Sequence, residues 1–145
     1  MIKSYRAKEE NTGKWVYGYY TLYPNGNGLH PCILTGIESG CIIPKFIDLV
    51  TLGSCTDMTD INDTEMFEGD IIQISSPNQS YNYLTVIYHK FCTLCINVPK
   101  EGSNVCAIGL AQSVWNEYEG TVEVIGNIYD NPELLGDEEN DSNDT

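Results

Sequence analysis

A strong hairpin signal near the N-terminus constrains the fold more than any other feature of this sequence. Residues 14–23 are rich in aromatic side chains, and the segment Pro24-Asn25-Gly26-Asn27-Gly28 follows them. An Asn-Gly pair between two β-rich runs is typical of a tight β-hairpin turn, because both turn residues must accept positive φ angles. The chain is therefore expected to begin with an antiparallel hairpin.

Further β-type runs follow, each bounded by turn-forming residues. Residues 45–52 fit either a strand or a short helical turn, and residues 53–70 are interpreted as a polar connection. Apolar side chains at helical spacing predict one late helix over residues 103–118. The other predicted strands cover residues 2–8, 14–23, 31–36, 41–44, 70–74, 83–89, 91–98 and 121–127.

These elements predict a mainly β (α+β) fold. Residues 1–56 are expected to form an N-terminal β-hairpin region, residues 57–70 an acidic connection, and residues 70–135 a small antiparallel barrel with the late helix. The sequence Glu68-Gly69-Asp70 ahead of an apolar strand is a common opening of an SH3-like barrel, because glycine allows the positive φ of a tight turn. The C-terminal part is therefore expected to be SH3-like.

The charge of the chain limits the kinds of partner that it can bind. It carries 21 acidic and 7 basic residues, a formal net charge of -14, and five of the acids lie in residues 136–145. That last segment has too little apolar surface to offset its ordering entropy, so a disordered acidic tail is expected. Nucleic-acid binding requires clustered Lys and Arg, and beyond residue 14 only three bases remain. A protein partner with a basic surface fits better, and homo-oligomerisation stays open.

The compartment follows from the N-terminus and the cysteines. The first residues contain no apolar signal segment, and no apolar run approaches the length of a membrane span. We therefore expect a cytoplasmic protein whose six cysteines stay reduced. Cys92-x-x-Cys95 has no second pair at zinc-ribbon spacing, and a strand would point its two thiols to opposite faces.

Catalytic and metal motifs are not recognised. An EF-hand register that starts at Asp60 fails, since it places Glu65 where glycine is needed and Ile71 where glutamate is needed. Nucleophile motifs, P-loops and dinucleotide fingerprints are missing, and the chain contains two histidines. The sequence therefore predicts a protein without enzymatic activity, cofactor or bound metal.

Several blocks of the sequence resemble the YopX family of bacteriophage and prophage proteins. The most specific block closes the domain, where a β-rich run ends in Gly126-Asn127 and a proline starts a helical turn. The resemblance spans residues 1–135 and implies a phage or prophage source and the family's fold, but no established reaction. It rests on Ile2, Lys3, Tyr5, Arg6 and Ala7, on residues 15–19, on residues 53–70, and on residues 123–135.

The sequence departs from the family pattern in one turn. Residues 57–63 replace a Gly-Leu-Lys-Asp-like segment, and Asp63 stands where the family has a glycine after Asn62. The turn is therefore expected to differ or to be strained. The cysteines are not part of the family pattern.

These observations lead to a first functional hypothesis. The chain is expected to be a phage-encoded accessory protein that binds a host or defence-system protein and modulates it. The exposed acids and tyrosines are the candidate contacts, through charge complementarity and aromatic anchoring. The candidate partner-binding residues are Asp57, Asp60, Asp63, Tyr17 and Tyr19.

Two alternatives belong to other classes. In the first, the protein sequesters a small molecule such as a signalling nucleotide. Phosphates would pair with cations and the base would stack on an indole ring, at Lys3, Arg6, Lys14 and Trp15. The second and weaker alternative is a metal-dependent enzyme built on the acidic connection.

Overall fold

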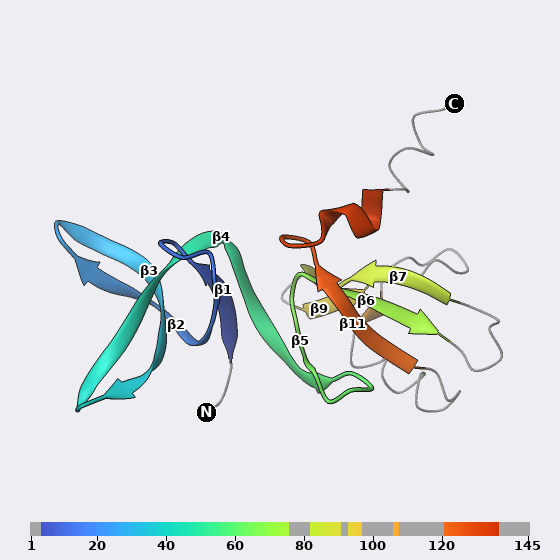
Figure 1. The fold of residues 1–145 in the computed structure, drawn as a ribbon, viewed down its shortest axis with the longest axis horizontal. Helices are drawn as coiled ribbons and strands as arrows, with labels where there is room; N and C mark the ends of the chain where they lie inside the picture. The colour runs from blue at the N-terminus through green and yellow to red at the C-terminus, as the bar shows by residue number, and fades with distance from the viewer. Residues whose placement is uncertain (1–3, 76–81, 91–92, 97–105, 108–120, 137–145) are drawn as a thin grey trace. The chain divides into compact units, whose positions relative to one another are not determined.

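The chain folds almost entirely into antiparallel β-structure. The computed structural model describes residues 4–75, 82–90, 93–96, 106–107 and 121–136. It divides into two compact units, Met1–Cys55 and Thr56–Thr145 (Figure 1). The predicted mainly β class is confirmed. Within the described residues, no helix is long and apolar enough to cross a membrane.

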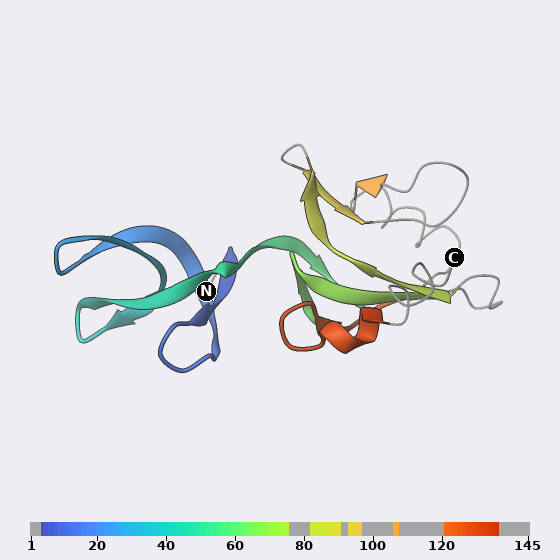
Figure 2. The ribbon, with the colours of Figure 1, turned by 90° about the horizontal axis from the view of Figure 1, so that it is seen from above.

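The first unit contains a sheet that returns on itself. Its order is β1-β2-β3-β4, and β1 also pairs with β4, which brings β1 beside β4 in the ribbon (Figure 2). The strands are β1 (Tyr5–Glu9), β2 (Trp15–Asn25), β3 (Gly28–Glu38) and β4 (Cys41–Thr59). The predicted hairpin is confirmed, because Asn25 pairs with Gly28, but the two turn residues are Gly26 and Asn27, and of these Gly26 has a positive φ.

The core of this first unit is small. Ala7, Ile33 and Ile47 are buried, and they belong to β1, β3 and β4. Tyr5, Val16, Tyr20 and Leu52 pack around them. Tyr5 and Ala7 of β1 are two residues apart, and Val16 and Tyr20 of β2 are four apart, so each pair shares a face of the sheet. Few residues therefore hold the sheet together, and its backbone contacts matter correspondingly more.

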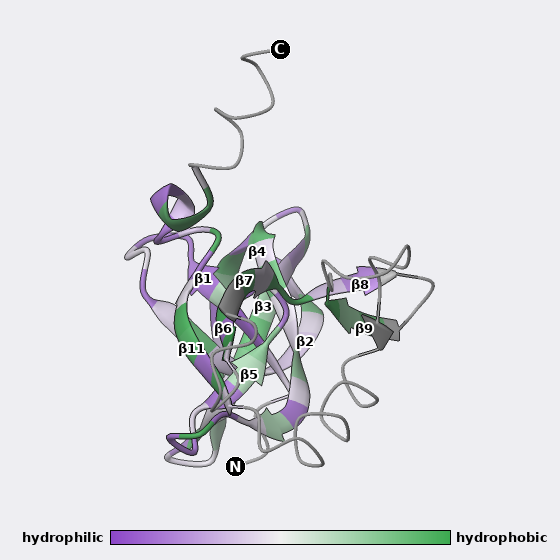
Figure 3. Cartoon of the chain, turned by 90° about the vertical axis from the view of Figure 1, so that its right-hand side faces the viewer, coloured by the Kyte–Doolittle hydropathy of each residue, from purple (hydrophilic) through white to green (hydrophobic). Residues whose placement is uncertain are grey.

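Among its described residues, the second unit contains two three-stranded sheets, in the orders β11-β6-β7 and β10-β9-β8. Their hydrophobic segments are visible in green along β9 and β11 (Figure 3). The shared core contains Met66, Ile72, Ile74, Ile87, Ile96 and Val122. The elements are β5 (Glu65–Phe67), β6 (Asp70–Ser75), β7 (Asn82–Val86), β8 (Tyr88–Lys90), β9 (Thr93–Ile96), β10 (Cys106–Ala107), β11 (Thr121–Asn127) and the 3₁₀ helix η1 (Pro132–Leu135).

Two expectations need correction. Residues 53–70 are not a polar connection, because β4 continues to Thr59 and pairs with β5 after a short turn. The helix predicted over residues 103–118 is wrong at its described residues, where Cys106 and Ala107 pair with β9 as strand β10. The rest of that range lies outside the described residues. Residues 45–52, which fitted strand or helix, form part of β4.

Candidate functional site

The turn between β4 and β5 is the candidate site. We call residues 57–65 the acidic turn, since they carry Asp57, Asp60, Asp63 and Glu65. The Asp60 N–H donates to the Thr64 carbonyl (2.9 Å), and the Asp63 N–H donates to the Asp60 carbonyl (3.1 Å). These bonds close a tight turn whose side chains, apart from those of Met58 and Asp60, are exposed.

Asp60 holds the acidic turn together from inside. It is 7% exposed, and one carboxylate oxygen accepts the N–H groups of Asn62 (2.8 Å) and Thr64 (2.9 Å). The other oxygen accepts the Val124 N–H (2.9 Å), which fixes the turn to β11. Burial by itself would raise the pKa of Asp60, but these backbone donors outweigh it, so its pKa lies below the ordinary aspartate value.

Ile61 is displayed by this anchored turn. Its backbone N–H donates to the Val122 carbonyl (3.0 Å), yet its side chain is 60% exposed. The neighbouring Asn62 reaches Glu123 of β11 (3.5 Å). An exposed isoleucine among carboxylates on a fixed backbone is suited to a partner surface that has an apolar pocket and a basic rim. Sequence reasoning missed Ile61, although its place in a polar segment was a usable signal.

Asp63 adopts the strained backbone conformation that was expected from its place in the family's glycine position. Its φ is +60°, in the left-handed region, and Asp57 has a φ of +61°. The turn therefore keeps a backbone conformation suited to glycine although an aspartate occupies the position.

We expect Asp63→Gly to raise the free energy of unfolding by up to about 1 kcal/mol, because glycine removes the left-handed strain at some cost in unfolded-state entropy. Urea denaturation of the two proteins measures this. The matched control is Thr64→Gly, since no positive φ is found at Thr64 and glycine should destabilise the turn there. A destabilising Asp63→Gly would show that the Asp63 side chain contributes more than the strain costs.

The structure separates the candidate partner-binding residues. Asp57 and Asp63 are exposed on the acidic turn, whereas Asp60 is buried. The expectation that Asp60 is a surface contact is therefore wrong, and its carboxylate is a structural acceptor. Tyr17 and Tyr19 belong to β2 of the first unit, where Tyr17 is partly buried and Tyr19 is 51% exposed.

The residues proposed to bind a nucleotide do not form an open site for a phosphate group. Arg6 is 7% exposed, and its guanidinium lies 4.6 Å from the centre of the Trp15 ring. Lys8 lies 5.5 Å from the same ring. Arg6 and Trp15 are therefore neighbours, as the hypothesis required, but each occupies the other's interaction surface. Lys14 is exposed, and Lys3 lies outside the described residues.

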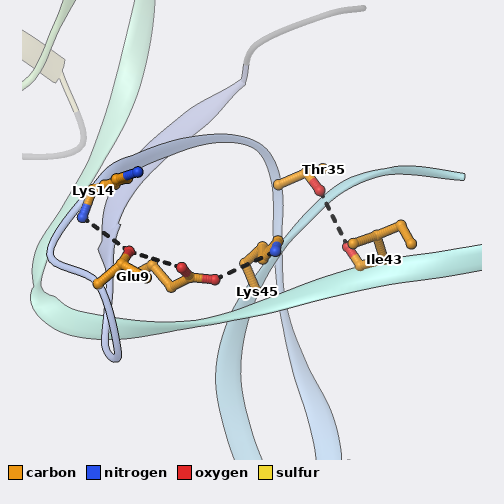
Figure 4. A network of polar contacts seen from close by, with 6 residues as sticks. Glu9, Lys14, Thr35, Ile43 and Lys45 are labelled. Carbon is orange, nitrogen blue, oxygen red and sulfur yellow. Dashed lines mark hydrogen bonds and ion pairs between the residues drawn. The ribbon is translucent and has the colours of Figure 1, made fainter. Parts of the chain in front are cut away.

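A hollow beside these residues also disfavours an anion. It has a volume of about 470 Å³ and contains Lys8 with the acids Glu9, Glu10 and Asp48 in its lining. Glu9 is ion-paired with Lys45 (3.6 Å), as Figure 4 shows, and its carboxylate also accepts a hydrogen bond from the Thr12 hydroxyl (2.8 Å). A phosphate in this hollow would meet more carboxylates than cations.

The described residues contain no group of three or more His, Cys, Asp or Glu side chains placed to hold a metal ion. His89 instead lies 2.8 Å from a carboxylate oxygen of Glu68. Cys95 is buried, as is Cys32, whose burial raises the pKa of its thiol. Cys92 lies outside the described residues.

The closing block of the chain is a structural motif. The Asn127 side-chain oxygen accepts the N–H groups of Tyr129 (3.0 Å) and Asp130 (2.9 Å), and its amide donates to the Asp130 carboxylate (3.1 Å). At Gly126 an added Cβ would lie 2.5 Å from the Asn131 side-chain oxygen. These residues turn the chain after β11 and lead into the proline-started helix η1.

A comparison with models of protein families identifies the family of the chain. The family model described as YopX protein matches residues 4–136. The chain belongs to the YopX family. A crystal structure of the protein yopX from Bacillus subtilis has a similar fold, with 23% identity, a TM-score of 0.57, and coverage of 93% of this chain and 99% of that one. A protein from Enterococcus faecalis follows, with 20% identity, a TM-score of 0.55 and the same coverages. No significant match is found among curated proteins.

The residues that carry the YopX resemblance mainly build the fold. Asp70 is 1% exposed, and its carboxylate accepts a hydrogen bond from the Phe67 N–H (2.8 Å). Gly69 has a φ of +92°, and a Cβ added there would lie 3.1 Å from a ring carbon of Tyr129. The buried Asp60 and Asn127 act in the same way. The shared motifs therefore specify turns, and they do not by themselves point to a functional surface.

Proposed function

We propose that the chain is a non-enzymatic, phage- or prophage-encoded binding protein that docks on a basic surface of a bacterial host or defence-system protein. The contact is made by the acidic turn, with Ile61 as the apolar anchor and Asp57 and Asp63 as the surrounding charges. Binding then modulates the partner, and the protein works in the host cytoplasm.

The observation that carries this proposal is the segregation of charge between the two units. Residues 1–55 contain five bases and four acids, whereas residues 56–145 contain two bases and 17 acids. The net charge of -14 is therefore concentrated in the second unit. A field of this sign attracts basic partners and speeds their association at low salt.

The rigidity of the acidic turn supports the choice of this surface. The hydrogen bonds of Asp60 and the Ile61–Val122 bond fix the turn before any partner arrives. Less conformational entropy is then lost on binding. An apolar side chain at the centre of a charged rim is also the arrangement in which binding energy is usually concentrated.

Charge reversal on the acidic turn tests the proposal. We expect Asp57→Lys/Asp63→Lys to weaken partner binding at least tenfold, because both charges become repulsive toward a basic surface. The measurement is quantitative affinity capture with the full chain from a lysate of Bacillus subtilis, the source of one similar structure, followed by titration of the captured protein.

The matched control is Glu10→Lys/Glu38→Lys, which changes the net charge equally but lies in the first unit, where both residues are exposed. Retained binding in the control and lost binding in the turn variant would support the acidic turn. A partner that binds both variants like the wild type, or that is lost only in the control, would contradict it. Ile61→Ala should reduce affinity without changing the salt dependence.

A further inference from the structure

Three strand segments of the first unit have a neighbouring strand on one side only, among the described residues. Residues 19–25 of β2 and residues 28–31 of β3 pair with each other, and the other pairings of these two strands lie elsewhere along them. Residues 41–45 of β4 pair with β3, while the pairing of β4 with β1 begins at Ile47. A one-sided segment presents backbone N–H and C=O groups to which a further strand can add.

These free edges differ from ordinary ones in their lack of charge. Residues 15–37 contain no Asp, Glu, Lys or Arg, and residues 19–23 read Tyr-Tyr-Thr-Leu-Tyr, a run that strongly favours strands. Soluble proteins protect such edges with charged side chains or with proline. The first two segments have no charged side chain, and each of the three segments contains one proline, namely Pro24, Pro31 or Pro44.

The register of the β2–β3 hairpin directs the nitrogens of Pro24 and Pro31 to the free edges. Asn25 and Gly28 flank the two-residue turn, and the pair that closes such a turn is hydrogen-bonded. Along an antiparallel ladder, hydrogen-bonded pairs alternate with pairs whose backbone groups point away from the partner strand. Pro24 and Pro31 lie one and three pairs from the closing pair, so their nitrogens point outward.

Pro44 is placed in the same way on β4. Leu34 pairs with Tyr19 six positions from the closing pair of the β2–β3 ladder, which makes this pair hydrogen-bonded and directs the Leu34 backbone groups to β2. On its other side Leu34 pairs with Pro44. That pair is therefore of the outward-pointing kind, and the Pro44 nitrogen faces away from β3. All three prolines of the first unit thus occupy edge positions.

We infer that Pro24, Pro31 and Pro44 close the free edges of the first unit to strand addition. A strand that adds to an edge needs its N–H donors, and proline removes one donor and fills the space with its ring. The prolines take the place of the charged side chains that these strands lack. A partner can then reach the first unit through side chains only, and a second copy cannot extend its sheet. The inference does not depend on the proposed function.

Pro24→Thr/Pro31→Thr in the full chain tests the inference, because threonine restores the N–H and favours strands. Light scattering after gel filtration measures the mass, under reducing conditions because Cys41 is exposed. An ionic strength of about 0.5 M screens the repulsion between the acidic chains. We expect the variant to have at least twice the mass of the wild type, through pairing of the opened edges of two copies. Pro44→Thr opens a different edge and should also gain mass.

Two controls separate edge protection from other effects of proline. Pro24→Lys/Pro31→Lys restores the same N–H groups but supplies a charge at each edge, so it should keep the wild-type mass. Pro132→Thr changes a proline of η1, outside any sheet, and should also keep it.

Thermal unfolding followed by circular dichroism shows whether a gain in mass comes from unfolded protein. Loss of proline increases the freedom of the unfolded chain in the threonine and lysine variants alike, so both should lose similar stability. A wild-type mass for both threonine variants would overturn the inference. An equal gain in mass for Pro24→Lys/Pro31→Lys would also overturn it, because the association would then follow lost stability and not an opened edge.

Discussion

Gly18→Ala is expected to destabilise the first unit strongly. A Cβ at Gly18 would lie 2.0 Å from the carbonyl oxygen of Leu34 and 3.0 Å from its carbonyl carbon, and Gly18 has a φ of +153°. Both obstacles are backbone atoms, so no side-chain rotation relieves them. Gly18 is held between Tyr5 of β1 and the adjoining β2–β3 ladder that starts at Tyr19. The strands must therefore separate.

The expected loss of unfolding free energy is on the order of 3 kcal/mol or more, in the range of substitutions that force backbone displacement. Because the buried core of this unit is small, we expect its thermal transition to fall by at least about 10 °C. Differential scanning calorimetry measures this. Gly28→Ala is the control, since its added Cβ meets nothing within 4 Å. Similar transitions for the two variants would show that β2 and β3 can shift apart at little cost.

Local signals were predictable from the sequence, and pairings over long distances were not. The hairpin was recognised because its turn chemistry lies in adjacent residues, but the turn itself is Gly26-Asn27, one residue later than the predicted Asn25-Gly26 pair. The continuation of β4 through residues 53–59 was missed because that polar segment becomes a strand only through its pairing with other strands. The predicted small barrel in residues 70–135 corresponds, among the described residues, to two three-stranded sheets, while the sheet that returns on itself lies in the first unit.

The candidate residues show the same limit. Arg6 and Trp15 were correctly expected to be neighbours, since a hairpin places them on paired strands. The burial of Arg6 was not predictable, because it depends on how β1 pairs with both β2 and β4. Asp60 was read as exposed from its polar surroundings. The spacing of Asp60, Asn62 and Thr64 is a local turn signal, but its third donor, Val124, lies 64 residues away in the sequence.

The second large loss of stability is expected when Asp60 is substituted. Asp60→Asn should lower the free energy of unfolding by about 2–4 kcal/mol, because one accepting oxygen is replaced by an amide that cannot accept from the backbone N–H groups. The pKa of Asp60 is lowered in the folded state. Its contribution to stability is therefore fully present above the ordinary aspartate pKa of about 3.9 and is lost as the pH falls through the lower folded value.

Urea denaturation of the wild type and Asp60→Asn between about pH 2.5 and 7 measures both effects. The difference in free energy of unfolding between the wild type and Asp60→Asn should be constant above about pH 5 and should become smaller below about pH 4. Asp63→Asn is the control, since Asp63 is exposed and asparagine tolerates its left-handed φ. A difference that does not change with pH would show that the Asp60 carboxylate is not the stabilising species. Because Asp60 also positions Ile61, a weakened turn should lose partner affinity even at neutral pH, although no exposed residue has changed.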